Sequence, residues 1–248
     1  MFSKLYITIK ASDKFDDSII DPISFILIDW GVDGNLIDWD IYPSRAKLEI
    51  NTEEIDLFVI EGLFATITNA NFDEEEFVSR IQASINYREQ YKALLQEKGI
   101  VLPSAAIYEL DVKTKEEMIH KALHLAIHQT ADEDIRSIRE LMLFGLKGLA
   151  AYLSHAEKLN YKNEALFSAA HEFMASLVND ELTLEQYVPM TLALGEAGVQ
   201  AMALLDEANT TTFGNPEIST VEIGVGTRPG ILITGHDLHA LNQLLEQT

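Results

Sequence analysis

Histidines are the residues of this chain whose type and position most clearly suggest chemistry. His236 directly follows Gly235 and the apolar, partly β-branched run 230–234. Such a run predicts a buried strand, and open α/β sheets bind their ligands at the carboxyl ends of strands. A helix is predicted after it, because four leucines there share one face: Leu238, Leu241, Leu244 and Leu245. His236 is therefore a candidate ligand-binding residue.

A second group of histidines follows helical spacing. His120, His124 and His128 are each four residues apart, so their side chains stack along one face of a predicted helix. Two of them could ligate zinc or iron, but Ile127 falls on the same face and no HExxH glutamate lies between them. We interpret this face as a partly exposed polar surface, with a metal site as the alternative.

Other recognisable patterns are better explained by structure than by catalysis. The glycines of "GVGTRPG" (224–230) precede a predicted strand instead of a helix, so we predict a turn and not a dinucleotide-binding loop. Gly145 and Gly148 lie inside a predicted helix, which indicates a close helix crossing. Ser154 and His155 are adjacent on that helix and do not face each other. No catalytic residue is assigned.

Composition narrows the possible functions. Forty acidic and 18 basic residues give a formal net charge of −22, which argues against binding to nucleic acid or to anionic membranes. The 248 residues contain no cysteine, which excludes disulfides, thiolate nucleophiles and cysteine-ligated iron–sulfur clusters. No apolar run approaches the ~20 residues of a membrane helix, and the N-terminus does not resemble a signal peptide. We expect a cytoplasmic protein.

The hydrophobic pattern divides the chain into three parts. Residues 1–50 alternate as strands do and predict a small β-rich segment. Residues 51–218 predict a helical bundle, and residues 219–248 the first strands and helix of a Rossmann-like α/β unit. The expected fold class is thus mainly α with β structure at both ends. Three helix starts are predicted from capping pairs: Asp73 with Glu76, Thr114 with Glu117, and Thr130 with Glu133.

Several stretches together resemble the hybrid cluster protein family, also called prismane proteins or hydroxylamine reductases. They are "LFVIEGLFATITNANFD", "DIRSIRELMLFGLKGLAAYLSHAEKL", "MALLDEANTTTFGNPE" and "VEIGVGTRPGILITGHDLHALNQLLEQT". The resemblance covers about residues 55–248. It implies a helical domain followed by two Rossmann-like domains, a cubane cluster near the N-terminus and an iron–sulfur–oxygen hybrid cluster between domains. The implied activity is reduction of hydroxylamine to ammonia, or of nitric oxide.

The resemblance also assigns one ligand and reveals several departures. The histidine of the family's GHD motif ligates the hybrid cluster and corresponds to His236, whereas a cysteine common before "GE" corresponds to Leu194. The other ligands, which are carboxylates, cysteines and a lysine, lie downstream in the family. We therefore expect a truncated or remodelled homologue that does not bind the cluster.

Two alternatives to this reading remain. The first is a non-catalytic helical interaction module, whose exposed C-terminal α/β strands would recruit a second copy or a complementary chain. The second is a His/carboxylate metal site at His236, with His239 or His171.

Overall fold

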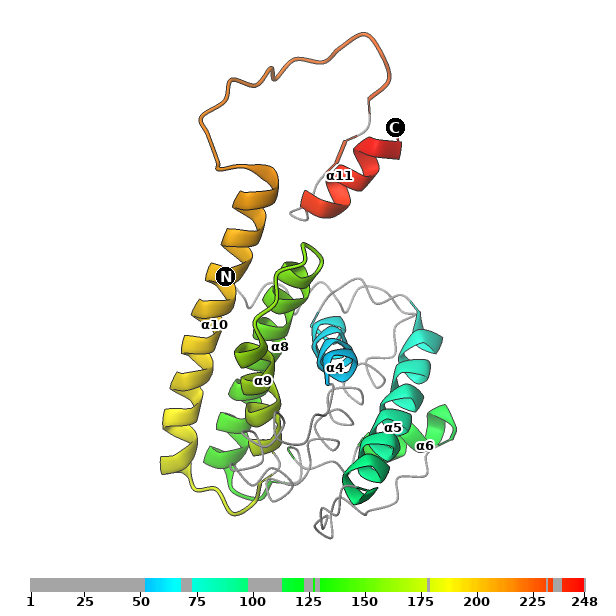
Figure 1. The fold of residues 1–248 in the computed structure, drawn as a ribbon, viewed down its shortest axis with the longest axis vertical. Helices are drawn as coiled ribbons and strands as arrows, with labels where there is room; N and C mark the ends of the chain where they lie inside the picture. The colour runs from blue at the N-terminus through cyan, green and yellow to red at the C-terminus, as the bar shows by residue number, and fades with distance from the viewer. Residues whose placement is uncertain are drawn as a thin grey trace.

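The computed structural model describes residues 52–67, 73–97, 113–122, 127, 130–177, 179–230, 232–233 and 238–247. These residues form seven helices, shown in Figure 1. The helices are α4 (Glu53–Ala65), α5 (Glu74–Glu97), α6 (Lys115–Ala122), α8 (Glu133–Glu157), α9 (Glu164–Ser176), α10 (Leu184–Phe213) and α11 (Leu238–Gln247). The predicted helical bundle is confirmed.

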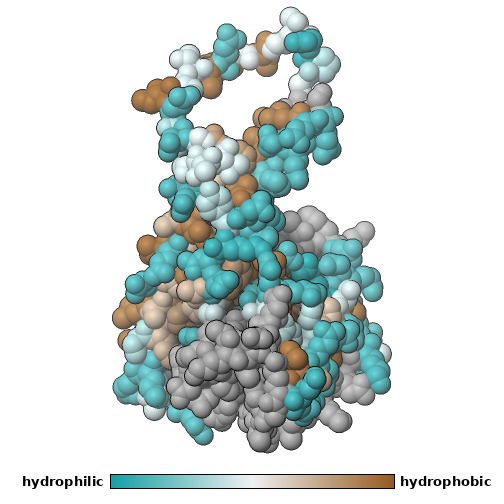
Figure 2. Space-filling view, in the orientation of Figure 1, coloured by the Kyte–Doolittle hydropathy of each residue, from teal (hydrophilic) through white to brown (hydrophobic). Residues whose placement is uncertain are grey.

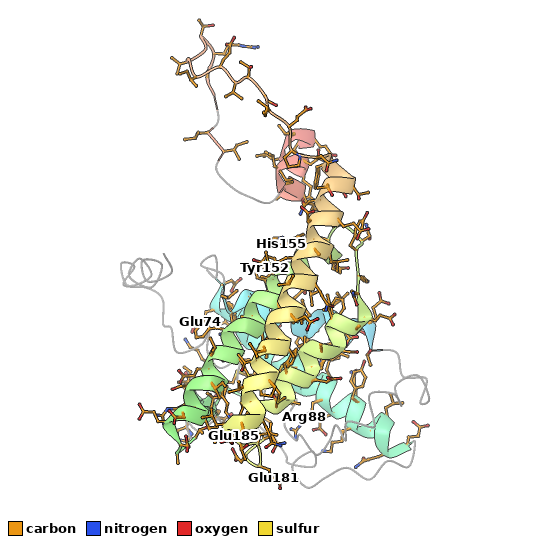
Figure 3. All side chains as sticks on the ribbon, turned by 90° about the vertical axis from the view of Figure 1, so that its left-hand side faces the viewer. Glu74, Arg88, Tyr152, His155, Glu181 and Glu185 are labelled. Atoms are coloured by element: carbon orange, nitrogen blue, oxygen red, sulfur yellow. The ribbon has the colours of Figure 1, made fainter. Side chains whose placement is uncertain are left out.

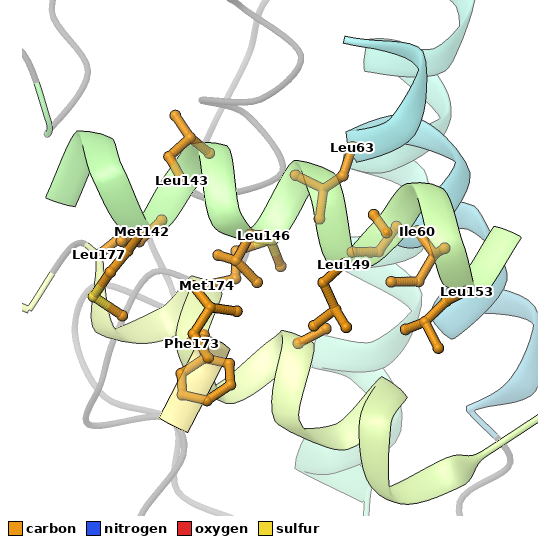
Figure 4. Close-up of a cluster of buried hydrophobic side chains, with 14 of the residues drawn as sticks. Ile60, Leu63, Met142, Leu143, Leu146, Leu149, Leu153, Phe173, Met174 and Leu177 are labelled. Atoms are coloured by element: carbon orange, nitrogen blue, oxygen red, sulfur yellow. The ribbon is translucent and has the colours of Figure 1, made fainter. Parts of the chain in front are cut away.

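Helix α8 forms the centre of this bundle. Its apolar residues recur every three or four positions, so they form a stripe that faces α4 on one side and α9 on the other. Figure 4 shows this core, with Ile60 and Leu63 from α4 and Met174 from α9 against the leucines of α8. The buried stripe of α8 contains Met142, Leu143, Leu146, Leu149 and Leu153. Burial of this stripe is the main force that assembles the helices.

Helix α10 lies along α8 and runs in the same direction, because α9 returns the chain between them (Figures 1 and 3). The two helices approach closely at Gly145, where an added Cβ would lie 2.9 Å from Cδ2 of Leu194. The predicted close crossing is therefore confirmed at Gly145. It is wrong at Gly148, whose Cβ would meet nothing within 4 Å.

Two of the three predicted helix starts are confirmed. Asp73 accepts hydrogen bonds from the backbone N–H groups of Glu75 and Glu76 at the start of α5. At α6, Thr114 and Glu117 form the predicted reciprocal pair, at 3.2 and 3.1 Å. The third prediction is wrong, because α8 is capped by Asp132 and not by Thr130. Both residues lie before the helix, and Asp132 is the one whose carboxylate reaches its first free N–H groups.

Thr130 instead belongs to a buried network around Arg139. The side chain of Arg139 is 1% exposed, and its guanidinium donates to the Tyr187 hydroxyl at 2.9 Å and to the Asn179 carbonyl at 2.8 Å. It also donates to Thr130 Oγ1 at 2.9 Å and to Asp180 at 3.0 Å. Burial raises the pKa of the Tyr187 hydroxyl, while Arg139 acts in the opposite direction. The network joins α8 to the α9–α10 connection.

The β part of the predicted fold class is wrong. The described residues contain no strand, and the segment 214–230 with residues 232–233, where strands of an α/β unit were expected, is irregular and largely exposed. Ile223 and Val225 are about fully exposed, at 98% and 101%. A strand needs a neighbour to accept its backbone hydrogen bonds, and none lies beside this segment within the described chain. The predicted β-rich segment 1–50 lies outside the described residues.

Within the described ranges, α10 is the one helix whose length and composition would allow it to cross a membrane. The prediction that no segment approaches this length and composition is therefore wrong for α10. A single such helix is weak evidence of a membrane, because packed helices of soluble proteins meet the same criterion. Only 17% of its most apolar window is buried, so most of this apolar helix is exposed.

Candidate functional site

The candidate site is a cavity at the end of the bundle, where α11 meets α8 and α10. Its empty volume is about 390 Å³, including space open to solvent. Three helices that are far apart in sequence line it: His155, Lys158 and Leu159 at the end of α8, Leu205 and Asn209 on α10, and Leu238 and His239 on α11. Figure 3 shows His155 at the upper end of α8, on the side toward α11.

The polar groups of this cavity are one ammonium group, two imidazoles and the Asn209 amide, and none of them is acidic. Lys158 contributes an ammonium group, and the half-buried His155 and His239 contribute two imidazoles. The ring of His155 packs edge-on against Phe64 at 5.1 Å between centroids. Nε2 of His239 lies 3.1 Å from Nε2 of Gln243, one turn further along α11. Such a set suits a small anion or a carboxylate better than a cation, because the cavity contains no carboxylate.

The structure tests only part of the predicted histidine sites. His236 lies outside the described residues, as do His124 and His128, so neither the GHD turn nor the three-histidine face is tested. His120 is exposed on α6. His239 lines the cavity just described. The structure thus brings His239 together with His155, which the sequence did not suggest as a partner.

His171, the other proposed metal ligand, lies in a different environment. Its Nε2 is 2.8 Å from Oδ1 of Asp56, and the side chains of the pair are only 9% and 15% exposed. Thr52 donates to the other oxygen of the same carboxylate at 2.9 Å. The pair joins α9 to α4. A histidine held in this way by a carboxylate acts as a structural link between helices.

The donor set of these residues does not fit an iron–sulfur cluster. Such clusters are held mainly by cysteine thiolates, and the 248 residues contain no cysteine. Leu194, which the sequence resemblance matched to a cysteine, is 4% exposed and packs against Gly145. Among the residues that the structure describes, no three His, Asp or Glu side chains are grouped to hold a metal ion. No catalytic step through a cluster is therefore derived for this chain.

The fold and site define a helical bundle with a cavity at one end that is lined by two histidines and a lysine, and comparison with known proteins identifies its class. The model of the Prismane/CO dehydrogenase family matches residues 43–248, so this chain belongs to that family. The match begins slightly earlier than the resemblance inferred from the sequence, and it includes the whole described structure.

Curated relatives agree with this assignment. The chain is 45% identical over 229 residues to a hydroxylamine reductase of Clostridium tetani, covering 82% of this chain and 40% of that protein. It is 46% identical over 206 residues to a hydroxylamine reductase of Desulfitobacterium hafniense, with 82% and 37% covered. The chain thus spans about two fifths of the length of these relatives.

Sequence reasoning missed three polar residues of the cavity, His155, Lys158 and Asn209. The sequence suggests no partner for His155 beyond its neighbour Ser154, and nothing in the local sequence links it to α11. The one available signal was that His155 and Lys158 lie in the last turn of a long predicted helix, where cations are favoured. The partner helices could be found only from the tertiary arrangement.

Proposed function

We propose that this chain is the helical module of a hydroxylamine-reductase-type protein, and that its 248 residues do not themselves bind an iron–sulfur cluster or catalyse the reduction. Family membership supports the first part. The observation that carries the second part is the absence of any cysteine, because imidazoles and carboxylates cannot replace the thiolates of such a cluster. The module would supply a rigid α8-centred scaffold, and α11 would lie at one end of it.

A second candidate function is a mononuclear His/carboxylate metal site centred on His236. It is supported only by the spacing of His236 and His239 in the sequence, because the cavity that His239 lines contains no carboxylate. Imidazole nitrogens are good ligands for iron and zinc. His171 does not support this candidate, because Asp56 already engages its ring nitrogen on a different pair of helices.

The two candidates are separated by iron and labile sulfide content after anaerobic reconstitution, with an identically treated buffer blank. The cluster-free module predicts neither iron nor sulfide. The metal site predicts about one iron per chain without sulfide, lost in His236→Ala while the helical circular dichroism is retained. Stoichiometric iron with sulfide would overturn the proposal.

The proposal includes a cytoplasmic location without nucleic-acid or anionic-membrane partners. The net charge of −22 supports this, since it repels phosphate-rich surfaces. Fractionation of the expressing cells tests the location, and a chain that pellets with membranes after a high-salt wash would contradict it.

A further inference from the structure

The most prominent surface feature outside the cavity is an apolar stripe on α10. It consists of Val188, Leu192, Val199 and Met202, which are 48%, 71%, 66% and 51% exposed. Their separations of four, seven and three residues place them on one face of the helix. Figure 2 shows hydrophobic side chains along the left-hand side of the molecule, where α10 lies.

Two further observations concern the surroundings of this stripe. Gly195 lies at the middle of the stripe, and an added Cβ there would meet nothing within 4 Å. On the neighbouring helix α8, Leu141 and Phe144 are also exposed, at 60% and 50%. Apolar side chains that gather on one exposed surface mark an interaction site more often than chance exposure does.

Charge argues against two possible occupants of the stripe. Helix α10 carries Glu185, Glu196, Asp206 and Glu207 and no lysine or arginine. A second copy would bring an equally acidic helix against it, in a chain of net charge −22. A bilayer would have to accommodate Glu196 near the middle of the helix, and an anionic surface would be repelled.

The length of the relatives indicates a third possible occupant of the stripe. The family match extends to residue 248, yet the chain spans only 37–40% of the relatives. We propose that the α10 stripe is the surface that packs against the remaining three fifths of a hydroxylamine-reductase-type polypeptide. In such an arrangement the exposed apolar face of α10 becomes an internal interface. The proposal rests on family membership and not on whether this chain binds metal.

The absence of cysteine makes the test direct, because an introduced cysteine is the only thiol in the chain. Leu192→Cys places this thiol in the stripe, and Gln90→Cys places it on the exposed surface of α5 as a matched control. Both should react rapidly with a thiol reagent in the isolated chain. Each variant is then co-expressed with the unmatched part of the Clostridium tetani relative as a separate, tagged polypeptide. The extent of labelling is measured as the increase in mass of this chain alone, so thiols of the partner polypeptide do not contribute.

The proposal expects co-purification of the two polypeptides and at least tenfold slower labelling of Leu192→Cys, with Gln90→Cys unchanged. A Leu192→Lys variant should keep its helical circular dichroism and melting temperature but lose co-purification. Three outcomes would overturn the proposal. They are no co-purification with the unaltered chain, equal labelling of Leu192→Cys in the complex, and protection of that thiol by raising the concentration of the chain alone or by adding vesicles.

Discussion

Gly145 of α8 and Leu194 of α10 form a close helix contact in the bundle core, since a Cβ on Gly145 would lie only 2.9 Å from Cδ2 of Leu194. The leucine at this position is buried, at 4% exposed. The position is thus part of the hydrophobic core in this chain.

Alanine at the two helical glycines of α8 should have different effects. Gly148→Ala is expected to raise the free energy of unfolding by about 0.5–1 kcal/mol, because the helix gains propensity and the Cβ meets open space. Gly145→Ala gains the same propensity but overpacks Leu194, so it should be less stable than Gly148→Ala by about 1–3 kcal/mol. Urea denaturation measures both variants. Equal stabilities would show that Leu194 moves aside without cost.

The buried network around Arg139 should be important for stability. Arg139→Met is expected to lower the free energy of unfolding by about 2–4 kcal/mol, because several hydrogen bonds from a charged group are lost. Asp180→Asn is the control. The side chain of Asp180 is 86% exposed, so its loss should cost no more than about 1 kcal/mol. Thermal and urea unfolding measure the loss of stability in both variants. A larger loss in Asp180→Asn than in Arg139→Met would contradict this account.

The pair of Tyr87 and Glu54 gives an alkaline pH dependence. The Tyr87 hydroxyl donates to Glu54 at 2.5 Å, and this hydrogen bond, with a smaller effect of desolvation, raises the pKa of Tyr87 to about 12. Because the folded-state pKa is raised, the stabilisation is complete below about pH 10, the pKa of an unfolded tyrosine, and is lost as pH rises toward about 12.

Absorbance of tyrosinate tests this shift. At pH 11 the unaltered chain and Tyr87→Phe should show nearly equal tyrosinate absorbance, because Tyr87 still holds its proton. Glu54→Gln should add close to one ionised tyrosine at that pH. If the absorbance of the unaltered chain already exceeds that of Tyr87→Phe by a full tyrosinate at pH 11, the hydrogen bond does not form in solution.

The contact between His171 and Asp56 should stabilise the packing of α9 on α4. His171→Ala is expected to lower the free energy of unfolding by about 1–3 kcal/mol, because a nearly buried carboxylate loses a partner. Iron content after reconstitution should be the same in this variant as in the unaltered chain. A double-mutant cycle with Asp56→Ala measures the coupling, and a value near zero would show that the two side chains act independently.

Local sequence was sufficient for most helices and for some of their ends. The Thr114–Glu117 pair was predictable because both partners lie within one turn, where capping depends on short-range geometry. At α8 the same reasoning selected Thr130, but Arg139 binds its hydroxyl and Asp132 caps the helix. A residue nine positions away thus overrode the local preference.

The amino-acid sequence by itself determined the residue types, and therefore the absence of thiolate ligands, the net charge, and the spacing of apolar residues that makes α8 the core helix. It also carried the family resemblance. Only the tertiary structure decided that α10 packs closely against Gly145 and not against Gly148, that His155 and His239 share a cavity, and that residues 221–225 form no strand. Each of these depends on which distant segment lies alongside, because packing and strand pairing need a partner that local sequence does not specify.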